Sequence, residues 1–275
     1  MLTRILSGVI PFPIVAFIIA MGGAPLTVLL IAVSIIGMSE IYKALNGAHR
    51  PENMLGYIAL LIYYLLLGSM NSELFIIFAG LFVMANLIWL MMFNRKATPI
   101  NCMVNIFGFF YVGLMLSGIY LTRNHAYGEF FVWLIFISAW ACDTCALFAG
   151  KFFGKRKLAP TLSPKKTVEG AIGGTLGACV IAGLFAYIAS TQFSDTFGGI
   201  GALATEMNLI LMSAVIGGIG AIFAQMGDLT ASAIKRYTGI KDYGKLIPGH
   251  GGILDRFDSV IFTAPIVYAV VWFLI

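Results

Sequence analysis

Charged residues are scarce in this chain, and their scarcity decides its class. Asp, Glu, Lys and Arg together make up 11% of the 275 residues, whereas 60% are hydrophobic. Apolar runs long enough to cross a bilayer recur through the whole sequence, which excludes an ordinary soluble globular domain. Low-complexity tracts, long linkers and clear internal repeats are also missing. We therefore predict an all-α, polytopic integral membrane protein.

Cysteine and histidine are equally sparse, with four and three residues. The pair Cys142-Asp-Thr-Cys145 has C-x-x-C spacing, but no second pair accompanies it, which argues against a structural zinc site. We expect all four cysteines to be small, buried, reduced thiols. His49 and His125 fall in loops and carry no functional signal. The phosphate-binding Walker A pattern is absent as well.

Nine segments are candidate membrane spans, although eight and ten remain alternatives. The segment 55–70 is short, and Pro11 and Pro13 interrupt the first segment. Because no small-residue cleavage site follows that segment, we expect a retained first helix rather than a signal peptide. The nine candidates are 5–21, 25–43, 55–70, 74–93, 102–121, 130–150, 169–190, 208–227 and 258–275.

The positive charges predict the orientation of the spans. With the N-terminus in the cytoplasm, every Lys and Arg except Arg123 falls on the cytoplasmic side. This asymmetry favours nine spans in the inner or plasma membrane, with the polar loops in the cytoplasm. The net charge of +5 is then a topology signal and an attraction for anionic lipid, not an indication of nucleic-acid binding.

Polar chemistry is concentrated in the second half. We divide the chain into N-terminal transmembrane helices, 1–127, and a C-terminal catalytic region, 128–275, with cytoplasmic insertions at 151–168 and 228–257. Two spans of this region are rich in glycine, which predicts close helix packing through small residues. Such packing would hold the polar helix ends in fixed positions.

The first insertion carries a cluster of positive charges. Ser163-Pro164 predicts a helix that begins there, since Ser is a good N-cap and Pro a good first helical residue. Lys165 and Lys166 would then oppose the helix dipole, unless an anion such as phosphate neutralises them. A Lys165–Glu169 pair or a simply solvated loop are the competing explanations.

The second insertion begins with an acid at a membrane boundary. Asp228 follows an apolar run, and an acid in such a position is a functional candidate by default. Ser232, Lys235 and Arg236 are expected to continue the same helix on the same or adjacent faces.

Two further acids, Asp255 and Asp258, lie three residues apart where the last span begins. Both could be simple helix caps. The glycine-rich stretch 248–252 before them offers backbone N–H groups to an anion. Carboxylates, cations and a glycine loop together indicate phosphoryl or nucleotidyl transfer assisted by Mg²⁺.

These polar positions resemble the signature of the phosphatidate cytidylyltransferase, or CDP-diacylglycerol synthase, family. The resemblance is strong over about residues 140–260 and departs at Leu147, where the family has an aromatic residue. The matching strings are Asp143-Thr144, Gly150, Gly154, Ser163-Pro164-Lys165-Lys166-Thr167-x-Glu169-Gly170, Ser232-x-x-Lys235-Arg236, Lys241-Asp242 and Pro248-x-His250-Gly251-Gly252-x-x-Asp255-Arg256-x-Asp258.

The resemblance implies an Mg²⁺-dependent membrane enzyme that converts CTP and phosphatidic acid to CDP-diacylglycerol and pyrophosphate. A second cation is an open option. Catalytic roles are expected for Asp228, Asp255, Lys235, Arg236 and His250, the last as a general base, a phosphate donor or a structural residue. Substrate contacts are expected from Ser163, Lys165, Lys166, Thr167, Ser232, Lys241, Gly251, Gly252 and Arg256. Metal ligands are expected from Asp228, Asp255, Asp258 and Asp143.

Other functions remain as alternatives. A CTP-dependent lipid kinase would use similar groups, whereas a secondary transporter would not need the charged cytoplasmic segment. A CDP-alcohol phosphatidyltransferase should carry D-G-x-x-A-R, which is absent. The expected partners are CTP, phosphatidic acid and the lipid bilayer, without nucleic acid, and a homodimer is left open.

Overall fold

The computed structural model describes residues 11–47, 50–93, 97–206, 208–246 and 251–275. These residues are almost entirely helical, which confirms the all-α prediction. The α-helices are α2 (Pro11–Met21), α3 (Gly23–Asn46), α4 (Asn53–Leu66), α5 (Ser72–Met92), α6 (Pro99–Gly108), α7 (Met115–Arg123), α8 (Gly128–Phe153), α9 (Val168–Gln192), α10 (Ile200–Glu206), α11 (Leu209–Thr238) and α12 (Leu254–Leu274). The structure also contains two short 3-10 helices, η1 (Leu67–Ser69) and η3 (Asp195–Phe197), and one π-helix, η2 (Phe109–Leu114).

Within the described ranges, seven helices are long and apolar enough to cross a membrane. They are α3, α5, the continuous unit Pro99–Arg123, α8, α9, α11 and α12. The unit Asn53–Ser69 is a shorter apolar helix, and α2 is the described part of the first expected span. The protein is therefore a multi-pass membrane protein, and the number nine stays a prediction.

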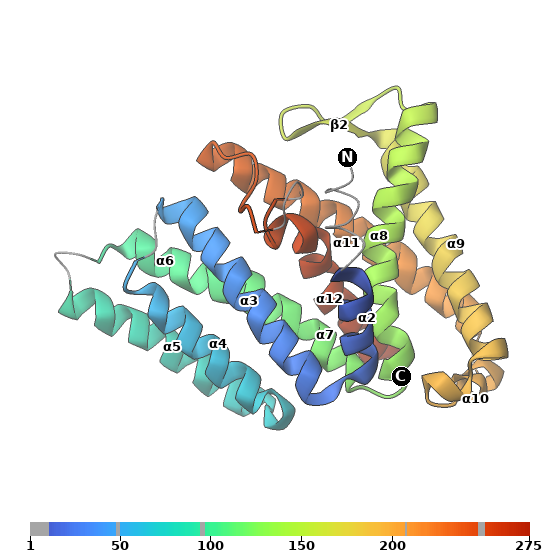
Figure 1. The fold of residues 1–275 in the computed structure, drawn as a ribbon, viewed down its shortest axis with the longest axis horizontal. Coiled ribbons are helices and arrows are strands. Elements are labelled where there is room, and N and C mark those ends of the chain that lie inside the picture. Colours follow the sequence, from blue (N-terminus) through green and yellow to red (C-terminus); the bar gives the residue numbers. More distant parts are fainter. Residues whose placement is uncertain (1–10, 48–49, 94–96, 207, 247–250) are drawn as a thin grey trace.

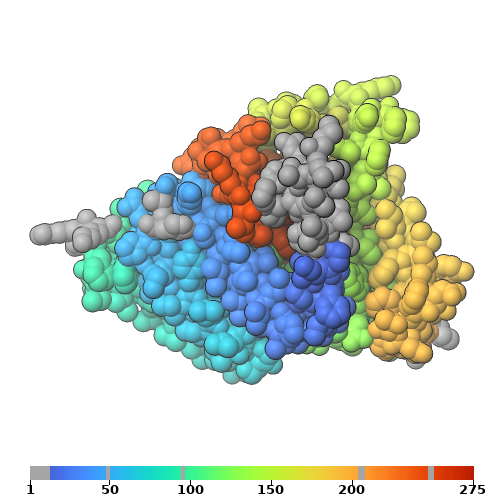
Figure 2. Space-filling model, viewed as in Figure 1, coloured from blue at the N-terminus to red at the C-terminus, as the bar shows by residue number. Residues whose placement is uncertain are grey.

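The helices form two groups around a central helix (Figure 1). Helices α3 to α6 lie on one side, and α8, α9 and α11 pack together on the other. Helix α12 lies between the groups and contacts α7, α8, α11 and α3. In Figure 2 the orange and red C-terminal segments emerge beside the blue N-terminal helices, at the same end as the yellow-green hairpin.

The hairpin consists of β1 (Lys157–Ala159) and β2 (Ser163–Thr167), which pair antiparallel. It follows the end of α8 and leads directly into α9. At the same end of the bundle α11 ends and α12 begins (Figure 1). The polar helix ends that the sequence singled out therefore face one region.

Small residues bring α8, α9 and α11 close together, as predicted. A Cβ added at Gly174 of α9 would lie 2.9 Å from the Cys142 carbonyl oxygen and 2.9 Å from the Ala146 Cβ of α8. On α9 the alanines at 178, 182, 186 and 189 are buried. All four cysteines are free; Cys102 and Cys142 are buried as predicted, whereas Cys145 and Cys179 are only partly buried. Backbones that approach so closely fix the helix ends against one another.

Candidate active site

A cavity of about 620 Å³ opens between α8, α9, α11 and the hairpin. Its size lies within the range of small-molecule sites. Its polar lining comes from Asp143, Lys151, Lys165, Lys166, Thr167, Gln225 and Asp228, and its apolar lining includes Ala146, Leu147 and Leu158. The cavity thus combines cations, carboxylates and an apolar wall.

The predicted helix start at Ser163-Pro164 is wrong. Residues Ser163–Thr167 form β2, and α9 begins only at Val168. Thr167 is the N-cap of α9, and its Oγ1 accepts a hydrogen bond from the Gly170 amide at 3.1 Å. Thr167 competes successfully with Ser163 for the cap because the strand pairing of β2 continues to Thr167. The lysines therefore precede the helix and do not oppose its dipole from within.

Thr167 also accounts for three glycines among the residues that resemble the family signature. A Cβ added at Gly150, Gly154 or Gly170 would lie 2.9 Å from the Thr167 Oγ1. The buried hydroxyl thus lies among three backbones that only glycine allows to come this close. The observed role of Thr167 is to join α8 to the start of α9.

Glu169 does not pair with Lys165 in the structure. Its carboxylate accepts hydrogen bonds from the backbone amides of Lys155 and Arg156, at 3.0 and 3.2 Å. This contact ties the turn after α8 to the first turn of α9. Lys165 is exposed and lines the cavity. Its ammonium group is therefore available to a ligand there.

Lys166 reaches across the cavity to α11. It forms an ion pair with Asp228, and both side chains are about one-quarter exposed. The Ser232 hydroxyl, one turn further along α11, donates a long hydrogen bond of 3.4 Å to the same carboxylate. As predicted, Asp228, Ser232 and Lys235 belong to one helix, since α11 extends to Thr238.

Two more carboxylates lie near Asp228. Asp143 of α8 is exposed toward the cavity, and Asp258 lies on the first turns of α12. Each interacts electrostatically with Asp228 and with the other. α12 can come this close because a Cβ at Gly227 would lie only 2.4 Å from the Asp258 carbonyl oxygen. The structure thus brings together three of the four predicted metal ligands.

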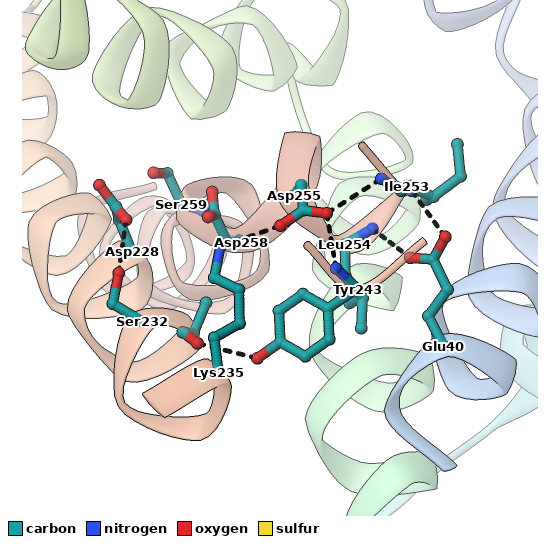
Figure 3. A network of polar contacts seen from close by, with 12 residues as sticks. Glu40, Asp228, Ser232, Lys235, Tyr243, Ile253, Leu254, Asp255, Asp258 and Ser259 are labelled. Atoms are coloured by element: carbon teal, nitrogen blue, oxygen red, sulfur yellow. Dashed lines mark hydrogen bonds and ion pairs between the residues drawn. The ribbon is translucent and has the colours of Figure 1, made fainter. Parts of the chain in front are cut away.

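Asp255 has a different environment from the other acids. Its Oδ1 accepts a 2.9 Å ion-pair hydrogen bond from Lys235, and its Oδ2 accepts from the amides of Tyr243 and Gly252, each at 2.9 Å. Figure 3 shows the α11 side chains on one side of this network and the start of α12 beside it. Two of the five predicted catalytic residues, Lys235 and Asp255, therefore pair with each other.

Tyr243 completes this network from the loop between α11 and α12. Its ring lies under the Lys235 ammonium, 5.3 Å from the ring centroid, and its hydroxyl donates to the Ala231 carbonyl at 3.0 Å. Burial, together with nearby Tyr111 and the surrounding carboxylates, raises the pKa of the Tyr243 hydroxyl above its usual value. The phenol therefore stays protonated and keeps its hydrogen bond.

The remaining predicted residues lie at the rim or outside the described ranges. Arg236 is exposed, and its Nε donates to the Leu162 carbonyl at 3.4 Å. Lys241 and Arg256 are exposed as well. Gly251 has a positive φ of 86°, which glycine tolerates, and Gly252 is buried. His250 lies outside the described residues, so its predicted role stays open.

Sequence reasoning missed Gln225 and Glu40. The Gln225 amide of α11 donates to the Thr175 hydroxyl at 3.0 Å and the Ala171 carbonyl at 3.2 Å. Glu40 of α3 accepts two hydrogen bonds from the start of α12. Both are polar residues inside apolar spans, so the rule that singled out Asp228 applies to them equally.

Among the described residues, no three Asp, Glu, His or Cys side chains are arranged as a ready metal-binding group. Mg²⁺ commonly takes one or two protein carboxylates and completes its shell with water and substrate phosphates. The buried Ser259 hydroxyl lies next to Asp258 and interacts with the Asp143 carboxylate. This hydroxyl and the three neighbouring carboxylates are hard oxygen donors, which fit a hard cation that binds together with a phosphate substrate.

A protein-family comparison covers nearly the whole chain. The model of the cytidylyltransferase family matches residues 2–274. The chain belongs to this family. The matched range includes the N-terminal helices, which the resemblance in the sequence had reached only through their hydrophobicity.

Comparison with individual relatives supports the same family assignment. A phosphatidate cytidylyltransferase of Bacillus subtilis is 34% identical over 279 residues, which covers 96% of this chain and 95% of the relative. The enzyme of the same name from Haemophilus influenzae is 39% identical over 144 residues, covering 52% of this chain and 46% of the relative. One from Staphylococcus aureus is 37% identical over 156 residues, or 57% and 54% of the two chains.

Proposed function

We propose that this protein is a membrane nucleotidyltransferase that converts CTP and phosphatidic acid to CDP-diacylglycerol and pyrophosphate. The observation that carries the proposal is the end-to-end similarity to a phosphatidate cytidylyltransferase. The cavity agrees in chemistry, since it offers three lysines and two carboxylates beside an apolar wall. The reaction forms a bond between a phosphatidate oxygen and the CTP α-phosphorus, and it breaks the bond from that phosphorus to the pyrophosphate.

Lys165 and Lys166 are the groups we assign to the phosphates. Lys165 is exposed at the cavity, and Lys166 is held at Asp228 until a phosphate competes for it. Both stabilise the negative charge that grows on the leaving pyrophosphate. Arg236 and Lys241 are exposed and are not among the residues that line the cavity, so we assign them to attraction of the polyanion rather than to the reacting atoms.

Asp228 and Asp258 are the residues we assign to Mg²⁺, with Asp143 as a further ligand and Ser259 in support. When bound, the ion would neutralise phosphate oxygens and lower the barrier for nucleotide transfer. Three carboxylates lie close together, Lys166 pairs with one of them, and the nearby Lys235 is already paired with Asp255, so the group favours an added cation. Asp255 is the least suited of the predicted ligands because Lys235 and two amides already occupy its oxygens.

The lipid substrate fits the placement of the cavity. Its acyl chains can stay in the bilayer while its phosphate reaches the polar ends of α8, α9 and α11. We place this end in the cytoplasm of a bacterial inner membrane, where CTP is available, because the positive charges gather there. The association of two copies stays a prediction, which mass measurement of the detergent-solubilised protein can test.

The test uses CTP that carries the label at a defined phosphate. Purified protein, phosphatidic acid and Mg²⁺ are incubated with CTP labelled at the α-phosphorus or at the γ-phosphorus, and lipids are then extracted. Label from the α position alone in the lipid phase is the expected result. Label from the γ position would instead indicate a lipid kinase, and label from neither would refute the proposal.

A further inference from the structure

One buried carboxylate of the N-terminal helices contacts the C-terminal region. Glu40, near the end of α3, is 7% exposed. Its Oε1 accepts a hydrogen bond from the Ile253 amide at 3.0 Å, and its Oε2 accepts from the Leu254 amide at 2.8 Å. In sequence these partners lie 213 and 214 residues away. Figure 3 shows Glu40 on the side of the network opposite Asp228.

The contact supplies what the start of α12 lacks. The first amides of a helix have no partners within the helix, and the N-cap residue Ile253 has no side chain that could accept one. A carboxylate at this point satisfies two of these amides and also interacts favourably with the helix dipole. Glu40 is therefore the N-terminal cap of α12, provided by another helix.

The loop before α12 is shaped around this carboxylate. A Cβ added at Gly244 or at Gly252 would lie 2.3 Å from the Glu40 Oε1. No real Cβ comes so close to another heavy atom, so both positions need glycine while Glu40 stays in place. Two loop segments thus pass directly over one side chain of the N-terminal half.

The same short stretch also holds Asp255. The Gly252 amide donates to Asp255, and the next two amides donate to Glu40, so three consecutive N–H groups end on carboxylates. Asp255 and Asp258 lie on the first turns of the helix that begins there. Any shift of this stretch would move Asp258 relative to Asp228 on α11.

We propose that Glu40 is a positioning residue for the active site. It acts through the backbone of Ile253 and Leu254 and sets where the carboxylates of α12 lie. The structural contact is independent of the reaction, but the expected effect on turnover rests on the proposed function. It also follows that the catalytic region 128–275 depends on the N-terminal helices for its geometry.

The first test compares Glu40→Gln and Glu40→Asp with Glu52→Gln. Glu52 is a matched control, since it is a buried glutamate of the same half that does not contact α12 through any hydrogen bond of the described residues. Gln turns one acceptor into a donor that faces an amide, whereas Asp keeps the charge. We expect Glu40→Gln to lower kcat by about tenfold or more, with KM for CTP changed less than about threefold. Glu40→Asp should retain more activity, and Glu52→Gln should resemble the wild type.

Hydrogen exchange provides a readout that needs no activity. Peptides that cover residues 251–259 should exchange about tenfold faster in Glu40→Gln, whereas they should be unchanged in Glu52→Gln. Unchanged exchange in Glu40→Gln would overturn the inference whatever the enzyme does. Faster exchange with unaltered kcat would overturn the positioning role, and faster exchange in a protein that never transfers nucleotide would instead refute the proposed function.

A second pair of variants keeps the proposal testable if Glu40→Gln does not fold. Gly244→Ala leaves Glu40 intact but pushes its carboxylate away from the amides, so it should reproduce the loss of kcat and the faster exchange. The double variant Glu40→Ala/Gly244→Ala should lose less than the sum of the two single losses, because both act on one contact. Additive losses, or a Gly244→Ala protein that behaves as the wild type, would contradict the proposal.

Discussion

Asp228 and Asp255 were predicted to have the same catalytic and metal-binding roles but should respond differently to the same substitution. Asp255 is 6% exposed and its partner Lys235 is 18% exposed, so Asp255→Asn leaves a shielded ammonium without its counter-charge. Breaking a buried pair costs about 3–5 kcal/mol, and the partial exposure of Lys235 favours the lower end, about 3 kcal/mol. For a chain of this size this corresponds to a fall in Tm of about 6–12 °C.

Asp228→Asn should instead affect turnover. Its pair with Lys166 is about one-quarter exposed on both sides, so its loss costs about 1 kcal/mol or less. Removing the charge also relieves repulsion from Asp143 and Asp258, which leaves Tm close to that of the wild type. If Asp228 stabilises the transition state as proposed, kcat should fall by about 10²–10³-fold.

Two measurements separate the outcomes. Tryptophan fluorescence on heating reports Tm, and transfer of α-labelled CTP into lipid reports kcat. Asp195→Asn is the matched control, since Asp195 is exposed in η3, beyond the end of α9 that lies away from the hairpin, and should change neither value. Asp228→Asn with more than about a tenth of wild-type kcat, or Asp255→Asn with an unchanged Tm, would refute the assignment of these two acids.

Three further predictions follow from the packing, the carboxylates and the charges. Gly227→Ala should lower both Tm and kcat, because its Cβ would meet the Asp258 backbone, whereas Gly80→Ala, which meets nothing within 4 Å, should be as stable as the wild type or more so. EDTA should abolish nucleotide transfer and excess Mg²⁺ should restore it, and full activity in EDTA would contradict the metal site. In a cysteine-free background, a cysteine at Lys157 should be labelled only from the cytoplasmic side and one at Asp195 only from outside, and the opposite pattern would reverse the topology.

The helices were predictable because a bilayer leaves the backbone few options. Apolar length alone located α3, α5, α8, α9 and α12 within a few residues, and the start of α11 as well. Helix α11 extends eleven residues past the predicted end of its span, to Thr238, as the shared face of Asp228, Ser232 and Lys235 suggested. The hairpin was missed because local capping rules favoured Ser163, whereas strand pairing placed the cap at Thr167.

The residues of the site were mostly predictable from the sequence, but the pairing of its acids with its cations was not. Residue types and spacing singled out six of the acids and lysines that meet in the structure, namely Asp143, Asp228, Asp255, Asp258, Lys166 and Lys235, but not Glu40. Which acid pairs with which cation depends on contacts between helices far apart in sequence. Glu40 shows the limit most clearly, because no local pattern indicates that α3 caps α12 from 213 residues away.

The charged and polar groups of the site fall into two regions: in one their charges are compensated within the protein, and in the other they are not. Lys235, Asp255, Tyr243 and Glu40 have their partners within the protein, so in a low-dielectric surrounding they form a rigid frame. By contrast, the neighbouring carboxylates of Asp143, Asp228 and Asp258 repel one another, and among the described residues only Asp228 forms an ion pair, with Lys166. Such groups are costly without a ligand, and a cation with its phosphates would relieve that cost. The frame can therefore hold the reactive groups in place while the binding free energy of the substrates compensates for their unfavourable placement.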